Sequence, residues 1–156
     1  MHTAQIEMLQ AMPIFGAIRA DVLEFMLEKA GRLEVTGGEY FFRENDEAQS
    51  MFVLERGSAS VIKSWQGREC VPHKLRAGDC FGEMALMDMS PRSAAVRADE
   101  ACSVIELATA NFMELYSRDL EQFALIQMNI GREVCRRLRA ADTLVFQLMM
   151  ERESKA

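Results

Sequence analysis

The sequence has few of the residues that build metal centres or disulfide frameworks. It contains four cysteines, and no two of them are separated by just two residues, as in a CxxC motif. Such spacing excludes a zinc ribbon or a disulfide-stapled scaffold, so we expect reduced, mostly buried thiols at Cys70, Cys80, Cys102 and Cys135. His2 and His73 are the only histidines, which are too few for a histidine-based metal centre. We therefore expect no bound metal and no cofactor.

Long apolar runs and a leader-like start are also missing. No apolar run approaches the roughly 18 residues of a membrane-spanning helix. The amino terminus lacks a basic segment followed by an apolar one, as a secretory signal would have. We therefore expect a cytoplasmic protein without membrane contact.

Basic residues are outnumbered by acidic ones, with 18 Lys and Arg against 24 Asp and Glu. The net charge of −6 argues against the broad basic surface that gives nucleic-acid-binding proteins their affinity, so we expect no direct DNA binding. The one concentration of basic residues is read as a solvated helix face, with an acidic partner as the alternative; it consists of Arg132, Arg136, Arg137 and Arg139. At 156 residues, with 49% hydrophobic and 27% charged residues, the chain is predicted to be one globular domain.

Catalytic constellations are absent as well. No Ser–His, Cys–His or Glu pair stands in a recognisable setting, and a nucleophile needs a neighbouring base or metal. We therefore predict a binding protein without catalytic residues rather than an enzyme.

The hydrophobic period changes twice along the chain. Helical spacing covers residues 3–12, Pro13 breaks it, and a second helix is predicted for residues 19–30. Short runs rich in Val, Phe and Ile then alternate with Gly-containing turns, which predicts strands at 33–36, 40–43, 51–55, 58–65, 69–75, 94–97 and 103–107. A strand series without helices between predicts an antiparallel sandwich or jelly roll.

Helical spacing returns after residue 108. Thr109 is predicted to cap a short helix, and Ser117 a long one over about residues 118–150. Apolar residues in its later half are spaced four and three apart, as in a coiled-coil seam: Val134, Leu138, Ala141, Val145 and Leu148. Two copies could pair along this seam, and the alternative is that the seam folds back onto the strands of its own chain.

The segment from Phe81 to Val96 reads FGEMALMDMSPRSAAV and combines groups suited to a cyclic phosphate next to a sugar. A helix starting at Gly82 would direct free N–H groups towards an anion. The Arg92 guanidinium can hold a phosphate with two parallel donors, and its only acidic neighbour in sequence is Asp88. The Glu83 carboxylate only accepts hydrogen bonds, so it suits a ribose hydroxyl instead.

This segment resembles the phosphate-binding cassette of the cyclic-nucleotide-binding domain family, which includes catabolite activator proteins, protein kinase A regulatory subunits and nucleotide-gated channels. GGEYFFRENDEAQSMFVLERGSASVI (37–62) and LRAGDCFGE (75–83) are also similar to that family. The resemblance spans roughly residues 12 to 150. It implies a mainly β fold with flanking α: an antiparallel jelly-roll β-barrel (32–108), N-terminal helices (1–31) and a C-terminal lid and dimer helix (109–156), together one domain over residues 1–156.

The resemblance also implies the ligand contacts. Glu83 is expected to bind the ribose 2′-hydroxyl and Arg92 the phosphate, while Gly82 lets the backbone approach the ligand. The remaining cassette residues expected at the ligand are Met84, Ala85, Ser93 and Ala94. By position against the catabolite activator, the base is expected to meet Val61, Val71, His73 and Asp142. We expect cyclic AMP as the ligand, and the hydroxyl of Ser93 leaves cyclic GMP open.

The sequence says less about what the domain would act on once a ligand is bound. In the bacterial activators a DNA-binding winged helix follows the long helix, whereas here only six residues follow Met150. We therefore expect a free-standing homodimeric sensor, read by an unknown effector protein through the 132–139 face or the 144–150 tail. The alternatives are a dimeric scaffold with a vestigial pocket and a fragment of a larger transcription regulator or channel, although Met1 and the polar end ERESKA suit a complete chain.

Overall fold

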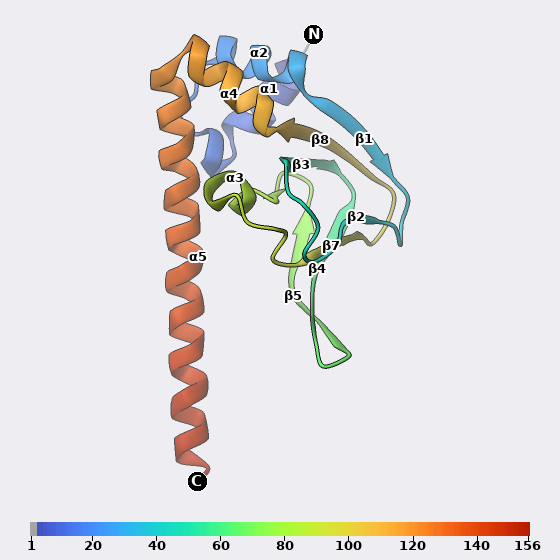
Figure 1. Ribbon diagram of the computed structural model, residues 1–156, viewed down its shortest axis with the longest axis vertical. Helices are drawn as coiled ribbons and strands as arrows, with labels where there is room; N and C mark the ends of the chain where they lie inside the picture. The colour runs from blue at the N-terminus through green and yellow to red at the C-terminus, as the bar shows by residue number, and fades with distance from the viewer. Residues whose placement is uncertain (1–2) are drawn as a thin grey trace.

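The computed structural model describes residues 3–156 and places two β-sheets beside a group of helices, with one long helix running past both (Figure 1). Met1 and His2, which belong to the predicted N-terminal region, lie outside the described residues. The chain begins with α1 (Thr3–Gln10), a 3-10 helix η1 (Pro13–Phe15) and α2 (Ala20–Lys29). Pro13 opens η1 after the end of α1, which confirms the predicted break between the two helices.

Each sheet has four antiparallel strands. One has the order β1 (Gly31–Val35), β8 (Cys102–Ala108), β3 (Ser50–Arg56) and β6 (Cys80–Phe81). The other has the order β2 (Tyr40–Phe42), β7 (Ala95–Ala98), β4 (Ser58–Trp65) and β5 (Arg68–Arg76). The predicted mainly antiparallel β fold with flanking helices is confirmed. No ladder of hydrogen bonds joins the edge strands of one sheet to those of the other among the described residues, so the predicted jelly-roll β-barrel is wrong in that the sheets do not close into a barrel.

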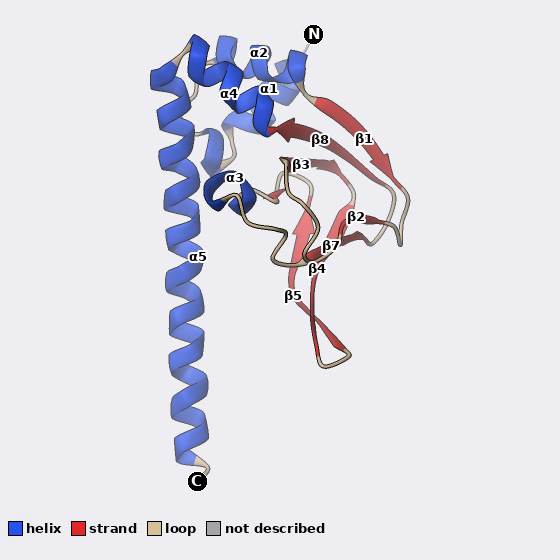
Figure 2. Cartoon of the chain, viewed as in Figure 1, coloured by secondary structure: helices blue, strands red, loops and turns tan. Residues whose placement is uncertain are grey.

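The alternation of side chains along β3 explains the two hydrophobic cores. Phe52 and Leu54 point between the sheets, where Phe52 stacks on Phe81 with ring centroids 5.2 Å apart. Met51 and Val53 point the other way and pack against the helices. Successive residues of a strand face opposite sides, so one strand contributes to both cores. The helices therefore pack against the outer face of the β1-β8-β3-β6 sheet at β3 and β8 (Figure 2).

The C-terminal helices are α4 (Thr109–Arg118) and α5 (Leu120–Ser154), and α5 alone has 35 residues. The predicted cap at Ser117 is wrong, because Ser117 lies within α4 and its hydroxyl donates to the Met113 carbonyl at 3.3 Å. Asp119 caps α5 instead, and its carboxylate accepts from the Gln122 N–H at 3.1 Å. Thr109 is the first residue of α4 and not its cap.

The later half of α5 projects beyond the sheets (Figure 1). Val134 is the last residue of the predicted seam that packs against the core, whereas Leu138, Val145 and Leu148 are more than half exposed. The seam therefore does not fold back onto the strands of its own chain. Its apolar side chains remain available for another surface.

The expectation of mostly buried thiols is wrong for half of the cysteines. Cys102 is buried and Cys80 half-buried, while Cys70 on β5 and Cys135 on α5 are exposed, and all are free. Residues 3–156 contain no cluster of His, Cys, Asp and Glu arranged to hold a metal ion. Over the same range, no helix has the length and apolar character needed to cross a bilayer.

Candidate functional site

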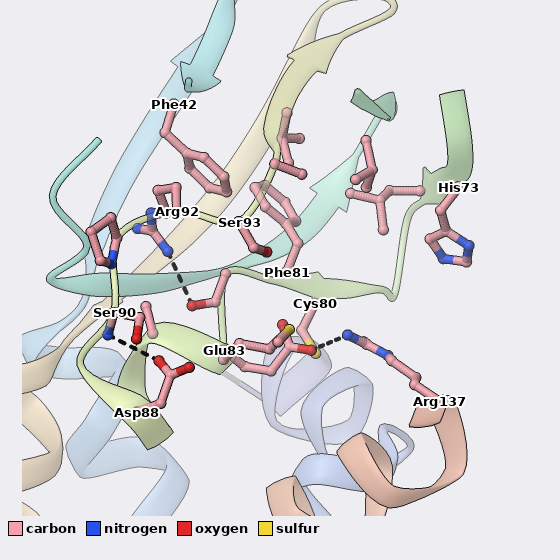
Figure 3. Close-up of a pocket in the computed structure, with 18 of the residues that line it drawn as sticks. Phe42, His73, Cys80, Phe81, Glu83, Asp88, Ser90, Arg92, Ser93 and Arg137 are labelled. Carbon is pink, nitrogen blue, oxygen red and sulfur yellow. Dashed lines mark hydrogen bonds and ion pairs between the residues drawn. The ribbon is translucent and has the colours of Figure 1, made fainter. Parts of the chain in front are cut away.

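The predicted cassette folds around a pocket of about 470 Å³. Ligand pockets commonly have volumes of 300–1,000 Å³, so a nucleotide-sized molecule fits this scale. The pocket lies between the 81–96 segment, the inner side of β4 and β5, and one face of α5 (Figure 3). All the cassette residues expected at the ligand line it: Gly82, Glu83, Met84, Ala85, Arg92, Ser93 and Ala94.

Arg92 is a buried cation without a carboxylate partner among the described residues. Its side chain donates to the Ser50 carbonyl at 2.7 Å and to the Gly82 carbonyl at 3.0 Å, and its guanidinium lies 4.0 Å from the centre of the Phe42 ring. The Nε atom is buried without a hydrogen-bond partner. Burial lowers the pKa of this guanidinium, although arginine stays protonated in proteins. Asp88, its acidic neighbour in sequence, accepts instead from the Ser90 N–H at 3.0 Å.

Gly82 is required by the position of Arg92. Its φ of +79° lies in the left-handed region, which costs other residues energy. A Cβ atom at this position would stand 2.6 Å from Arg92 Nη1, inside contact distance. The glycine thus allows both the turn after β6 and the inward position of the guanidinium.

Glu83 is a buried carboxylate, only 1% exposed, and a cation from α5 reaches it. Arg137 donates from Nη1 to Glu83 Oε1 (Figure 3). Glu83 and Arg137 lie 54 positions apart, so the contact ties the cassette directly to the long helix. The side chain of Arg137 is about half exposed, at 48%, which leaves it free to exchange partners. Burial, followed by the nearby charge of Glu83, raises the pKa of the Cys80 thiol, so this cysteine stays protonated.

The turn that follows Arg92 is fixed from the opposite side of the pocket. Lys63 on β4 donates to the Ser93 carbonyl and pairs with Glu44 at 2.8 Å. The Arg92 N–H donates to the Asp46 carbonyl at 2.9 Å, and the Asn45 N–H to the Arg92 carbonyl at 2.8 Å. These contacts hold the backbone of the arginine, so its side chain position is preorganised.

The residues expected at the base divide into two groups. Val61 and His73 line the pocket and face each other as partners in the β4–β5 ladder. Val71 does not line it, because the ladder is irregular just beyond that pair and leaves Val71 exposed on the extended hairpin. Asp142 does not line it either, since α5 presents Ala140 to the pocket and Asp142 lies about 200° further round the helix.

Sequence reasoning missed several residues of the pocket. In the sequence, Arg137 is one of a group of four arginines, and no local pattern distinguishes it from its neighbours on the helix. The short helix α3 (Met84–Asp88) begins two residues later than expected, so Gly82 and Glu83 precede it. The other lining residues outside the prediction include Phe42, Leu75, Cys80 and Ala140.

Comparisons with known proteins agree with this geometry. The family model described as "Cyclic nucleotide-binding domain" matches residues 32–119. Among solved structures, that of Thermus thermophilus catabolite activator protein is similar with a TM-score of 0.78 and 26% identity, over 87% of this chain and 62% of that one. The regulatory domain of Toxoplasma gondii PKA with cAMP is similar with a TM-score of 0.67 and 25% identity, over 70% of this chain and 42% of that one.

Among curated proteins, the cAMP-activated global transcriptional regulator Vfr of Pseudomonas aeruginosa is 32% identical over 75% of this chain. The cAMP-dependent protein kinase regulatory subunit of Emericella nidulans is 29% identical over 69% of it. The chain spans only part of these relatives, 55% of the former and 26% of the latter.

Proposed function

Because the chain belongs to the cyclic nucleotide-binding domain family, we propose that it binds a cyclic nucleotide in the pocket beside α3 and responds through α5. The observation that carries this proposal is the state of Arg92. A buried cation costs considerable solvation energy unless an anion pairs with it, and here none of the described carboxylates does. An anionic ligand in the pocket would supply the missing partner.

The other groups suit the rest of such a ligand. The cyclic phosphate would accept from the guanidinium of Arg92, which lines the pocket, and the neighbouring ribose 2′-hydroxyl would donate to Glu83. Glu83 has a second carboxylate oxygen besides the one that Arg137 occupies, so it can bind both groups at once. The purine would lie along Val61, Leu75 and His73, where the wall is mainly apolar.

We take cyclic AMP as the preferred nucleotide. Support comes from the relatives, since Vfr is named as cAMP-activated and the PKA domain was solved with cAMP. Ser93 stands at the pocket rim and its hydroxyl could also contact a guanine in the syn conformation. Cyclic GMP is therefore the competitor that the experiment must include.

The response would pass through Arg137 and Ala140, the residues by which α5 lines the pocket. A nucleotide that contacts Glu83 changes the surroundings of Arg137 and so favours one position of α5 over another. A ligand shifts such an equilibrium only by its difference in affinity for the two states. We further propose that α5 pairs with a second copy along its exposed seam and that a separate effector protein reads its position.

Isothermal titration calorimetry tests the binding proposal. We expect saturable one-site binding of cyclic AMP, weaker binding of cyclic GMP, and little binding of 5′-AMP, whose phosphate is not held in a ring with the ribose. Arg92→Ala should abolish the heat signal, with circular dichroism showing whether its strands remain folded. Absence of binding by both cyclic nucleotides to the intact chain would overturn the proposal and favour the scaffold alternative.

A further inference from the structure

The first part of α5 is fastened to the N-terminal segment by buried amides. Asn129 donates from Nδ2 to the Ile14 carbonyl at 3.1 Å and to the Gly16 carbonyl at 2.9 Å. Gln122 accepts from the Arg19 N–H at 2.9 Å. Both amide side chains are buried, at 7% and 6% exposure, so these contacts are shielded from water. These hydrogen bonds hold this part of α5 in a fixed position relative to η1.

The junction between α4 and α5 is fastened as well. Asp119 caps the helix and also accepts from Arg19 Nη2 at 2.8 Å. Arg19 therefore contacts the junction through its side chain and the first turn of α5 through its backbone. A bend of α5 at this junction would break both contacts.

Gly131 follows immediately after the buried Ile130 and is the only glycine in α5. A Cβ atom built on it would meet nothing within 4 Å, so packing does not require a glycine there. Glycine inside a helix is disfavoured relative to alanine by about five-fold in the helix equilibrium. The residue with the lowest helix propensity in α5 thus lies directly after the last fully buried residue of the helix and one turn before Val134, its last residue packed against the core.

The turn after Gly131 has open space beside it. Glu133 and Arg137 border a second hollow of about 720 Å³, whose other walls include η1 and β5. Arg137 also borders the nucleotide pocket. Beyond Val134 the helix makes few contacts with the rest of the described chain, since its apolar side chains are exposed.

We propose that Gly131 is the hinge of α5, about which the segment from Arg132 to Ser154 swings while the segment before it stays fixed. This inference rests on the proposed ligand response for its purpose, but the hinge itself exists without ligand. Arg137 lies about 9 Å beyond Gly131 and Met150 about 28 Å, at 1.5 Å per residue. A bend of about 10° would then move Arg137 by about 1.6 Å, enough to break its contact with Glu83, and Met150 by about 5 Å.

Distances between spin labels distinguish this hinge from one at the α4–α5 junction. The exposed Cys70 and Cys135 are replaced by serine, and labels are attached at Glu28→Cys with either Met128→Cys or Gln147→Cys. Labelled chains are diluted with unlabelled protein so that distances within one chain dominate. In the ligand-free protein we expect a narrow distribution for the pair 28–128 and a broad one for 28–147.

The deciding variant is Gly131→Ala, which restricts the backbone without a steric clash. We expect it to narrow the 28–147 distribution and to leave 28–128 unchanged. Thr143→Ala is the control, because it also raises helix propensity but lies beyond the hinge, and it should not narrow either distribution. An unchanged 28–147 distribution in Gly131→Ala, or a 28–128 distribution as broad as 28–147, would overturn the hinge.

A second arm adds cyclic AMP. If the nucleotide binds by calorimetry, we expect the 28–147 distance to shift and 28–128 to stay. If both distances shift together, the hinge lies at the α4–α5 junction and the inference is wrong. If no nucleotide binds, the proposed function fails while the ligand-free comparison still decides the hinge.

Discussion

At the scale of single residues, the pocket depends on how closely Gly82 and Arg92 approach each other. The guanidinium is held by two backbone carbonyls and an aromatic ring, and all of these are neutral. These contacts orient the cation but do not neutralise it. The guanidinium therefore places a positive charge without an anionic partner next to the position of the proposed phosphate.

Replacing Gly82 tests this approach. Gly82→Ala should weaken cyclic AMP binding by about 1.5–3 kcal/mol, the scale of a hydrogen bond to a charged group, because the new Cβ would displace Arg92. Gly67→Ala is the matched control, since Gly67 also has a positive φ, +76°, but a Cβ there meets nothing within 4 Å. Both variants should lose about 1–2 kcal/mol of stability from the left-handed backbone. Equal affinities in the two variants would show that the displaced guanidinium does not matter.

Replacing Glu83 tests the ribose contact. Glu83→Ala should weaken cyclic AMP binding by about 1.5–3 kcal/mol through the loss of a charge-assisted hydrogen bond. It also releases Arg137, whose half-exposed side chain can be solvated by water. Calorimetry of Glu83→Ala and of Glu47→Ala, an exposed acid outside the pocket, measures the difference. An unchanged dissociation constant in Glu83→Ala would contradict a contact between the Glu83 carboxylate and the ribose.

At the scale of elements, the sequence predicts the helices and strands that have a local hydrophobic pattern. It does not predict features that depend on contacts with distant parts of the chain. The strands were predictable because runs rich in Val, Phe and Ile are separated by Gly-containing turns, but β6 has only two residues and forms no such run. Barrel closure depends on pairing between edge strands, which no single strand encodes. The start of α5 was misplaced because Ser117 and Asp119 are equally good capping residues and only the fold decides between them.

The site divides in the same way. The cassette residues lie within one short segment, so their common location followed from their order. Arg137 reaches the pocket only because α5 runs past it, and Asp142 misses the pocket because the helix turns it away. Val71 misses it because the ladder becomes irregular next to Val61. Sequence spacing alone could not reveal any of these relations.

The cap of α5 makes its stability depend on pH. The Gln122 N–H, and then the Arg19 guanidinium, hold the pKa of Asp119 below its ordinary value. The folded chain therefore binds this proton less readily than the unfolded chain, so the carboxylate stabilises the fold above a pH of about 3.9 and less as pH falls through its folded pKa. Asp119→Asn should lower the melting temperature near pH 7 and lower it by less near pH 3. If Asp119→Asn lowered the melting temperature equally at both pH values, a stabilising charge on the Asp119 cap would be contradicted.

At the scale of the whole molecule, α5 carries an apolar seam that its own chain leaves uncovered. The exposed fractions are 59% at Leu138, 54% at Val145 and 56% at Leu148. Residues at alternating spacings of three and four lie on one face of a helix, so they form a continuous stripe along the projecting part. A second α5 offers the same stripe, and pairing would remove both from water.

Substitutions in this stripe test the dimer. Burial of one Leu or Val side chain contributes about 1.5–3 kcal/mol, so Leu138→Glu with Val145→Glu should raise the dimer dissociation constant at least roughly a hundred-fold. Thr143→Glu is the control, because Thr143 lies on the opposite face of the helix and its exposed charge should leave the dimer intact. Sedimentation velocity over a range of concentrations gives the masses. If the unsubstituted chain sediments as a monomer at every concentration, the seam serves another partner and α5 must transmit the ligand signal within a single chain.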